Sequence, residues 1–293
     1  MKILTDSIPK DVVLTIGKFE GVHLGHQKLI GAVVKKAKEL DKKSAIIVFE
    51  PHPYVFFGTS DQRLLLTDLE RNHLLQGLGI DYILQFTFDA NFAALTPEQF
   101  CRIIFENCKN VYVGEDYKFG NNRSGDVLFL RQEAKKYNAT VDIISLQDSI
   151  STSNIRSLIS EGKIQETNSL LGFNYFSLGQ TKQGKQLGRT IGFPTLNIYP
   201  PKDKLLPPNG VYQTITTVND QIYKSITNIG LRPTVENVTT PAIETHLLDY
   251  KKNEELYNKF IKVEFTRFVR PEIKFASVDE LIKQITEDIK KLC

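Results

Sequence analysis

Two histidines stand three residues apart in a glycine-rich turn near the start of the chain. The string GKFEGVHLGH carries Gly17, Gly21 and Gly25 around His23 and His26, between a predicted strand and a predicted helix. Glycines let the backbone approach a phosphate, and a helix N-terminus presents unpaired N–H groups and a positive dipole to it. The two imidazoles share one helix face, so both could donate to phosphate oxygens as charge builds on them. The turn therefore predicts a catalytic phosphate site, with a turn that carries incidental histidines as the structural alternative.

The string STSNIR offers a second candidate anion site. It combines the hydroxyls of Ser151, Thr152 and Ser153 with the guanidinium of Arg156 at a predicted helix start. Hydroxyls, backbone N–H groups and a guanidinium in this arrangement suit a leaving pyrophosphate. A Ser/Thr run before a helix can also be a simple N-cap. Its position after the last predicted strand of the first half favours the anion site.

The second half of the chain carries a candidate magnesium site. Thr195 and Asn197 are two apart on a predicted strand, so a hydroxyl and an amide oxygen lie on one side of it. The neighbouring glycine-rich turn, with Gly184, Gly188 and Arg189, distinguishes them from ordinary strand residues. We therefore predict that this region holds a magnesium-bound nucleotide, with Thr195 and Asn197 as the metal ligands.

A phosphate-binding P-loop is a weaker interpretation of the same region. The string GQTKQGK, residues 179–185, satisfies the first seven positions of that motif. The eighth is Gln186, where a magnesium-binding Ser or Thr should stand, and the residues that follow do not predict a long helix. The motif is therefore not expected to act as a P-loop.

The residues from Val12 to about Leu171 predict an α/β fold. Short β-branched runs alternate there with amphipathic segments, a pattern typical of a parallel sheet covered by helices. Helical spacing of apolar residues predicts a helix over 24–40, and Thr67 with Glu70 and Thr96 with Gln99 resemble capping boxes. The predicted strands have the sequences VVLTI, SAIIVF, DYILQF, NVYVG and TVDIISL.

After a short helical stretch over 155–171, strand-like runs follow one another without predicted helices between them. Asn219-Asp220 is typical of a tight hairpin turn. One terminal helix is predicted from Ser277, with Glu280 completing a capping box. We predict an antiparallel β-barrel with one helix packed on it. The two domains are predicted to span 1–172 and 173–293.

The composition is that of a folded cytoplasmic protein. The 293 residues are 41% hydrophobic and 24% charged, which excludes disordered, collagen-like and disulfide-scaffold classes. A net charge of +3 without a run of five basic residues gives no reason to expect a nucleic-acid or membrane partner. Three cysteines without CxxC spacing fit a reducing compartment, and no apolar stretch reaches the roughly 18 to 20 residues of a membrane span. The oligomeric state is left open.

These strings together resemble a known family. HxGH after a first strand resembles the nucleotidylyltransferase superfamily, and GKFEGVHLGHQ resembles the bacterial bifunctional riboflavin kinase/FMN adenylyltransferases, or FAD synthetases. The resemblance covers nearly the whole chain. It is carried by FEPHP, GEDYKFGNNRSG and STSNIR in the first half, and by GRTIGFPTLNI, NGVY, NIGLRPT, ETHLLDY and RPEIKF in the second.

The resemblance implies a Rossmann-like nucleotidylyltransferase domain followed by a riboflavin kinase β-barrel. It implies that MgATP phosphorylates riboflavin to FMN in the barrel, and that FMN and a second ATP give FAD and pyrophosphate in the first domain. Glu244 would be the base that accepts the ribityl 5′-hydroxyl proton. The implied cofactor-binding residues of the first domain are Gly17, Phe19, Gly21, Gly25, His52, Asp116, Phe119, Ser151, Thr152 and Ser153, and those of the barrel are Gly184, Gly188, Arg189, Thr195 and Asn197.

Four departures from the family pattern leave alternatives open. Glu20 replaces an Asp, Thr152-Ser153 reverses the usual order, Gln183 replaces a His, and Leu196 replaces an Ala beside Asn197. The added volume of Leu196 could re-aim Asn197. The runner-up is therefore an FMN adenylyltransferase whose kinase-like barrel serves flavin binding or structure. A flavin-sensing regulator and a nucleotidylyltransferase for another small metabolite are the remaining alternatives.

Overall fold

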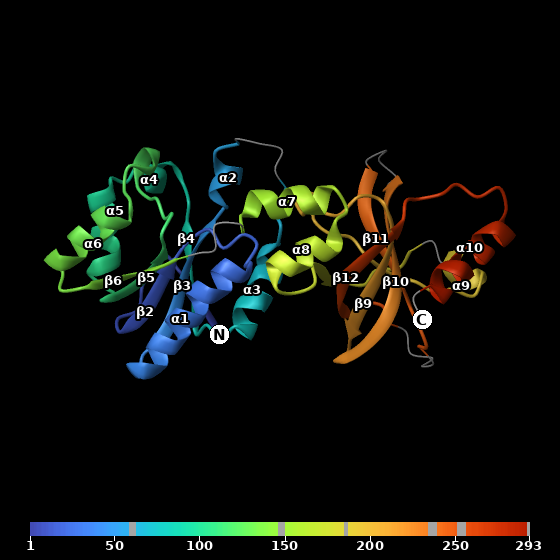
Figure 1. Ribbon diagram of the computed structural model, residues 1–293, viewed down its shortest axis with the longest axis horizontal. Helices are drawn as coiled ribbons and strands as arrows, with labels where there is room; N and C mark the ends of the chain where they lie inside the picture. The colour runs from blue at the N-terminus through green and yellow to red at the C-terminus, as the bar shows by residue number, and fades with distance from the viewer. Residues whose placement is uncertain (59–62, 146–149, 185–186, 234–238, 251–255, 292–293) are drawn as a thin grey trace. The chain divides into compact units, whose positions relative to one another are not determined.

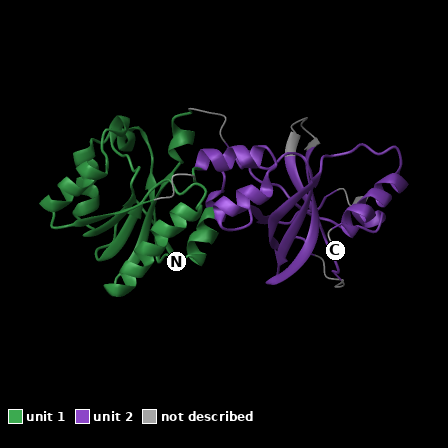
Figure 2. Ribbon diagram, in the orientation of Figure 1, with its two compact units in different colours: residues 1–62, 71–151 green, residues 63–70, 152–293 purple. Residues whose placement is uncertain are grey.

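The structure is a computed structural model that describes residues 1–58, 63–145, 150–184, 187–233, 239–250 and 256–291 (Figure 1). Cys293 and the pair Lys185-Gln186 of the P-loop-like string lie outside the described residues. The chain divides into two compact units (Figure 2). Unit 1 comprises Met1–Gln62 and Arg71–Ser151, and unit 2 comprises Arg63–Glu70 and Thr152–Cys293. The predicted domain boundary between residues 172 and 173 stays a prediction.

Unit 1 is built around a six-stranded sheet in which every neighbouring pair is parallel, in the order β1-β4-β3-β2-β5-β6. This confirms the predicted α/β fold and all five predicted strands. The sequence analysis missed β1, a short edge strand with mostly exposed residues and no apolar run. The strands are β1 (Lys2–Thr5), β2 (Val12–Ile16), β3 (Lys43–Glu50), β4 (Tyr82–Thr87), β5 (Asn110–Gly114) and β6 (Thr140–Ile144).

The helices of unit 1 begin where the sequence places their caps. Thr96 and Gln99 form a full capping box at the start of α5, and His23 is the N-cap of α1. Thr67 and Glu70 exchange the same two bonds at the start of α3. The elements are α1 (Leu24–Glu39), α2 (Pro53–Phe56), α3 (Asp68–Gly77), α4 (Ala90–Ala93), α5 (Pro97–Phe105), the 3-10 helix η1 (Asn121–Arg123) and α6 (Val127–Lys136). The first three residues of α3 belong to unit 2 and the rest to unit 1.

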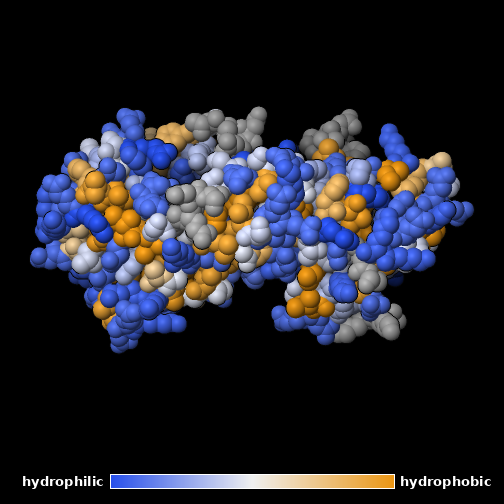
Figure 3. Space-filling view, in the orientation of Figure 1, coloured by the Kyte–Doolittle hydropathy of each residue, from blue (hydrophilic) through white to orange (hydrophobic). Residues whose placement is uncertain are grey.

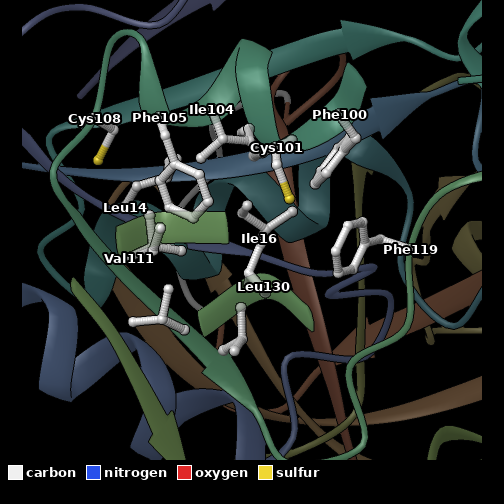
Figure 4. Packing of buried hydrophobic residues seen from close by; sticks show 14 of the residues in the cluster. Leu14, Ile16, Phe100, Cys101, Ile104, Phe105, Cys108, Val111, Phe119 and Leu130 are labelled. Carbon is white, nitrogen blue, oxygen red and sulfur yellow. The ribbon is translucent and has the colours of Figure 1, made fainter. Parts of the chain in front are cut away.

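The core of unit 1 lies between the central strands and the helices α5 and α6. Leu14 and Ile16 of β2 belong to one buried cluster with Phe100, Ile104 and Phe105 of α5 (Figure 4). The remaining residues of β2 point to the opposite face of the sheet, and they are buried as well. The near-continuous apolar sequence of this strand is explained by burial on both faces.

The strand order places the carboxyl ends of β2 and β5 at a switch point. From β2 the chain adds β3 and β4 on one side, and it later adds β5 and β6 on the other. In open parallel sheets, ligands bind in the crevice at the carboxyl ends of the strands where the order reverses. The turn over residues 17–26, which carries His23 and His26 and is called the histidine turn below, follows β2. The GEDYKFG loop follows β5, so the topology brings both to this crevice.

Unit 2 contains an antiparallel sheet in the order β7-β12-β9-β10-β11-β8. An isolated bridge between Lys182, just past β7, and Asn197 of β8 joins the two ends, which confirms the predicted barrel as nearly closed. Asn219 and Asp220 both have positive φ, as the predicted hairpin turn between β9 and β10 requires. The strands are β7 (Phe176–Gln180), β8 (Leu196–Ile198), β9 (Gly210–Val218), β10 (Gln221–Pro233), β11 (Thr239–Leu247) and β12 (Phe260–Arg270).

The predicted terminal helix packs on this barrel. Ser277 is its N-cap, Ile289 packs against Val211 and Ile226, and Arg270 donates to the buried Asp288 at 2.8 Å. A four-residue helix between β7 and β8 was not predicted. The helices of unit 2 are α7 (Thr152–Ser160), α8 (Ile164–Leu171), α9 (Leu187–Thr190) and α10 (Val278–Lys290).

Within the described ranges, no helix is both long and apolar enough to cross a bilayer. On the face drawn in Figure 3, hydrophilic residues border the orange hydrophobic areas of each unit.

A buried ion pair fixes segment 63–70 within unit 2. Lys204 Nζ donates to Glu70 Oε2 at 2.8 Å and to the backbone carbonyls of Leu65 and Phe176. The other carboxylate oxygen of Glu70 accepts from the Leu178 backbone N–H at 3.0 Å. Burial lowers the pKa of Lys204, and the Glu70 carboxylate opposes that shift. Every proton of the ammonium group therefore has an acceptor, which offsets the cost of its burial.

Glu70→Gln should destabilise unit 2 strongly, because it leaves the buried ammonium of Lys204 without a counter-charge. We expect a loss of about 3–5 kcal/mol in the free energy of unfolding, measured by urea denaturation. Glu161→Gln is the matched control, because Glu161 pairs with Lys163 on the surface with both side chains about half exposed. That variant should have almost no effect. Equal losses in the two variants would contradict this account.

Candidate active sites

The turn from β2 into α1 is backbone-strained and tightly packed. A Cβ on Gly17 would lie 2.9 Å from the Phe19 ring, so only glycine leaves room for that ring to fold back. Phe19 and Val22 are fully buried and both have positive φ, at 45° and 44°. A left-handed conformation is uncommon for a bulky residue and a true outlier for a β-branched one. The surrounding structure must therefore hold this turn in place.

The turn delivers His23 and His26 as a stacked pair. Their ring centroids are 3.8 Å apart with an interplanar angle of 18°. His23 Nδ1 accepts a hydrogen bond from the His26 backbone N–H at 3.4 Å, as an N-cap does. With Nδ1 as acceptor, a neutral His23 carries its hydrogen on Nε2, which is then available as a donor. The Phe19 ring lies 5.1 Å from the His26 ring and supports it.

Burial keeps both imidazoles neutral. It lowers the pKa of His23 to about 4, although the Asp116 carboxylate acts in the opposite direction. Burial, together with the smaller effect of the nearby His23, lowers the pKa of His26 to about 3. Among the described residues, His26 Nδ1 is buried without a hydrogen-bond partner. Both rings are therefore neutral donors at pH 7, and a bound anion would favour their protonation.

The β5 loop contributes one charge and one buried ring to this region. Asp116 is exposed, and its effect on His23 places the two predicted residues close together. Phe119 is buried, and its ring lies 5.1 Å from the Phe100 ring in the core (Figure 4). A Cβ on Gly125 would meet the same ring at 2.8 Å. Phe119 thus anchors the loop, and a direct contact with a flavin stays a prediction for both residues.

His52 begins the short helix that follows β3. It is buried, and its Nδ1 accepts from the Tyr54 backbone N–H at 3.3 Å, so it has the role of an N-cap. Lys18 Nζ lies 4.1 Å from the centre of the Tyr54 ring, a cation–π contact. This contact joins the histidine turn to the FEPHP string. A direct role of His52 in nucleotide binding stays a prediction.

The predicted anion site at STSNIR forms the start of α7. Thr152 is its first residue, and Ser151 and Ser153 are exposed. Arg156 is the fifth residue of α7, and its guanidinium donates to the backbone carbonyl of Arg63 within unit 2. The helix start predicted from the sequence is therefore present, and the pyrophosphate role of these residues stays a prediction.

In unit 2, the predicted residues Asn197 and Glu244 form a row across the sheet with Asn228, which was not predicted. Antiparallel register places Glu244 of β11 opposite Asn197 of β8 on one side and opposite Asn228 of β10 on the other. Side chains at opposite positions lie on the same face, with Cβ atoms about 4.5–5.5 Å apart. The sheet therefore brings Glu244 and Asn197 together, although 47 positions separate them in the sequence printed above.

The predicted metal ligands fit a magnesium ion. Asn197 is buried, and within the described part of the chain its Oδ1 has no hydrogen-bond partner. An unsatisfied buried amide oxygen is the donor type that this ion binds, and Thr195 supplies a half-buried hydroxyl two residues before it. A Cβ on Gly184 would lie 2.6 Å from the Asn197 amide nitrogen, so the glycine turn closes over this side chain.

The segment before Thr195 is held by contacts that only partly follow from the sequence. A Cβ on Gly188 would lie 2.3 Å from the Phe193 carbonyl oxygen, which explains this glycine. His246, two residues after Glu244, bonds the Pro194 carbonyl oxygen through Nδ1 at 2.8 Å. Arg189 is exposed at the end of α9, and its binding role stays a prediction.

Comparison with known proteins assigns both halves of the chain. The FAD synthetase family model matches residues 5–158, and the riboflavin kinase family model matches residues 171–292. The bifunctional riboflavin kinase/FMN adenylyltransferase of Bacillus subtilis is 35% identical over 285 residues, which cover 94% of this chain and 90% of that protein. The protein of the same name from Escherichia coli is 35% identical, over 97% of this chain and 93% of its own.

The chain belongs to the bifunctional riboflavin kinase/FMN adenylyltransferase family. A crystal structure described as a macrolide-efflux protein from Streptococcus pneumoniae has the same fold, with a TM-score of 0.84 and 27% sequence identity. The superposition covers 98% of this chain and 97% of the Streptococcus pneumoniae chain.

One departure from the family pattern is harmless to the geometry of this riboflavin kinase/FMN adenylyltransferase family member. Leu196 pairs with the buried Thr245, and Asn197 pairs with Glu244 on the opposite face. Because strand side chains alternate, the extra volume of Leu196 lies on the other side of the strand from Asn197. Glu20 is buried in the histidine turn, and Gln183 is exposed beside Gly184.

The sequence analysis missed three polar residues near Glu244. Asn228 lies opposite Glu244, and its amide donates to Glu272 at 3.3 Å. Asn209 donates to the other oxygen of Glu272 at 3.4 Å. All three lie in strings that resemble the family, but the strand register is needed to place Asn228 opposite Glu244, and the two hydrogen bonds join Glu272 and Asn209 to Asn228.

The low pKa values of the histidine pair predict how unit 1 responds to acid. The unfolded chain takes up protons on these rings near pH 6.5, whereas the folded chain does so only near pH 4 and 3. Stability should therefore fall as pH falls through this window, because the unfolded state binds more protons. In His26→Gln the drop in urea midpoint between pH 7 and pH 5, followed by circular dichroism, should be smaller than in the wild type. An unchanged drop would show that His26 is not buried as a neutral ring.

Proposed function

We propose that this chain makes FAD from riboflavin in two steps. Unit 2 phosphorylates riboflavin with MgATP to give FMN, and the histidine turn of unit 1 serves the adenylylation of FMN by a second ATP, with release of pyrophosphate. The observation that carries the proposal is the match of each half to its own enzyme family, together with full-length relatives named for both activities. It favours two activities over an adenylyltransferase with a degraded barrel.

In the adenylylation step, the FMN phosphate attacks the α-phosphorus of ATP in line. The phosphate monoester is already ionised at pH 7, so this step needs no general base and no covalent enzyme intermediate. His23 and His26 donate to the phosphate oxygens and stabilise the charge that develops there. Their neutral resting state suits this task, because the charge arrives with the substrate. Positioning and electrostatics therefore carry the reaction.

The remaining predicted residues of this step have supporting roles. The backbone of Gly17, Gly21 and Gly25 lets the triphosphate approach the turn, which Phe19 supports from below. His52 contacts the nucleotide, and Asp116 with Phe119 shapes the flavin side.

The start of α7 is proposed as the pyrophosphate-binding element. Ser151, Thr152 and Ser153 supply hydroxyls and backbone N–H groups, and Arg156 supplies a positive charge.

In the kinase step, Glu244 accepts the proton of the ribityl 5′-hydroxyl as that oxygen attacks the γ-phosphorus of ATP. Thr195 and Asn197 hold Mg²⁺, which neutralises charge on the nucleotide phosphates. Gly184, Gly188 and Arg189 form the turn that covers the nucleotide. The strand register supports this assignment, because it places Glu244 directly opposite Asn197.

The partners and location follow from the composition. We propose that the protein acts in the cytoplasm on ATP, riboflavin and FMN alone, without nucleic acid or membrane. Cys101 and Cys108 are buried free thiols, and burial raises their pKa to about 12 and about 11, so both are unreactive.

A product assay with two variants tests the two-step proposal. His26→Ala should suppress FAD formation from FMN by the equivalent of about 2.7–4 kcal/mol and leave FMN formation from riboflavin intact. Glu244→Gln should do the reverse. Each reaction is the folding control for the other. FAD from FMN without any FMN from riboflavin in the wild type would establish the adenylyltransferase alone, and equal loss of both reactions in either variant would indicate misfolding or one shared site.

Gly184→Ala tests the magnesium site without replacing either proposed metal ligand. The new Cβ would meet the Asn197 amide and displace it, so the kinase rate should fall on the order of 100-fold while FAD formation from FMN is unchanged. Gly179→Ala is the matched control, because its Cβ would meet only Ile198 at 3.4 Å. A full kinase rate in Gly184→Ala would show that Asn197 is not held where the reaction needs it.

A further inference from the structure

Val22 is the most strained residue beside the histidine pair. Its φ of 44° lies in the left-handed region, and its β-branched side chain is fully buried. Such a residue relaxes to negative φ unless its surroundings prevent it. Leaving the left-handed region changes ψ of Val22 as well as φ. Because ψ of Val22 sets the peptide plane between Val22 and His23, that plane would rotate, and the direction of the His23 side chain depends on it.

Gln27 bonds the two peptide planes that flank His23. Its backbone N–H donates to the His23 carbonyl oxygen at 2.9 Å, which is the first hydrogen bond of α1. Its side-chain Nε2 donates to the Val22 carbonyl oxygen, also at 2.9 Å. The first plane determines ψ of His23 and the second determines φ. One residue therefore constrains both backbone angles of His23, which are −63° and 172°.

The conformation that results is the one the histidine pair needs. With these angles His23 is an extended N-cap, its Nδ1 faces the His26 backbone N–H, and the two rings stack. A rotated Val22–His23 plane would break the cap, free Nδ1 and let His23 sample both tautomers. The bond from the helix backbone survives any substitution of the Gln27 side chain, so α1 itself does not depend on it.

We propose that Gln27 is a positioning residue for adenylyl transfer: its side-chain amide holds Val22 in the left-handed conformation and so aims His23 at the phosphates. The inference rests on the proposed role of the histidines. It assigns Gln27 no contact with substrate. The strain at Val22 is thus the reason that the turn needs a side-chain clamp in addition to the helix backbone.

Gln27→Leu removes the donor and keeps the side-chain size. We expect kcat for FAD formation from FMN to fall about five- to tenfold, the loss of one hydrogen bond, with KM for ATP and FMN changed by less than about twofold. FMN formation from riboflavin should be unchanged. The ring nitrogens of His23, observed by two-bond ¹H–¹⁵N correlation, should change from one tautomer to a mixture. Gln76→Leu, the same substitution at an exposed position of α3, should change none of these.

A double-mutant cycle with Val22→Gly separates positioning from general stability. Glycine adopts positive φ without steric cost, so the clamp matters less in its presence. The additional loss of kcat caused by Gln27→Leu should therefore be smaller in the Val22→Gly background than in the wild type. The same additional loss in both backgrounds would overturn the proposal, as would a full kcat with an unchanged His23 tautomer in Gln27→Leu, or equal losses in both reactions.

His26→Ala, assayed in parallel, separates the proposed role of the histidine pair from the proposed role of Gln27. Full FAD formation in His26→Ala would overturn the role of the histidine pair and the role of Gln27 with it. An inactive His26→Ala beside a fully active Gln27→Leu would overturn only the role of Gln27.

Discussion

Two imidazole rings stacked 3.8 Å apart in a buried turn can coexist only if they are not both charged, and this constraint governs the transferase half of the molecule. Burial keeps both rings neutral, with pKa values of about 4 and 3. The glycine at position 17, the folded-back ring of Phe19 and the left-handed Val22 all serve to hold the pair in that environment. Both rings are therefore neutral at pH 7, which is the state that the proposed phosphate-donor role requires.

In the kinase half, strand pairing rather than a turn positions the candidate residues. A polar row is generated by antiparallel register, which sets Glu244 between Asn197 and Asn228. A glycine turn then closes over Asn197, just as Gly17 makes room for Phe19 in the other half. In both cases a regular element fixes the functional side chain, and a missing Cβ lets a neighbouring segment approach it. The two proposed phosphate sites therefore lie on two unrelated folds.

Local signals carried much of this architecture. The apolar run of β2, the helical spacing of α1 and the cap at Thr96 all depend on nearby residues, so the sequence predicted them. The histidine turn could be located in the sequence because its glycines and histidines are close together in the chain. Features made by distant residues could not be predicted: Lys204 and Glu70 pair across 134 positions, and the left-handed Val22 is imposed by its burial and by Gln27. The edge strand β1 lacked an apolar pattern altogether.

The most direct test of the histidine mechanism is a crystal structure of the protein with FMN and a non-hydrolysable ATP analogue. The account predicts that Nε2 of both His23 and His26 lies about 3 Å from phosphate oxygens of the analogue, with the rings still stacked. A triphosphate bound elsewhere, with both imidazoles facing only protein atoms, would contradict it.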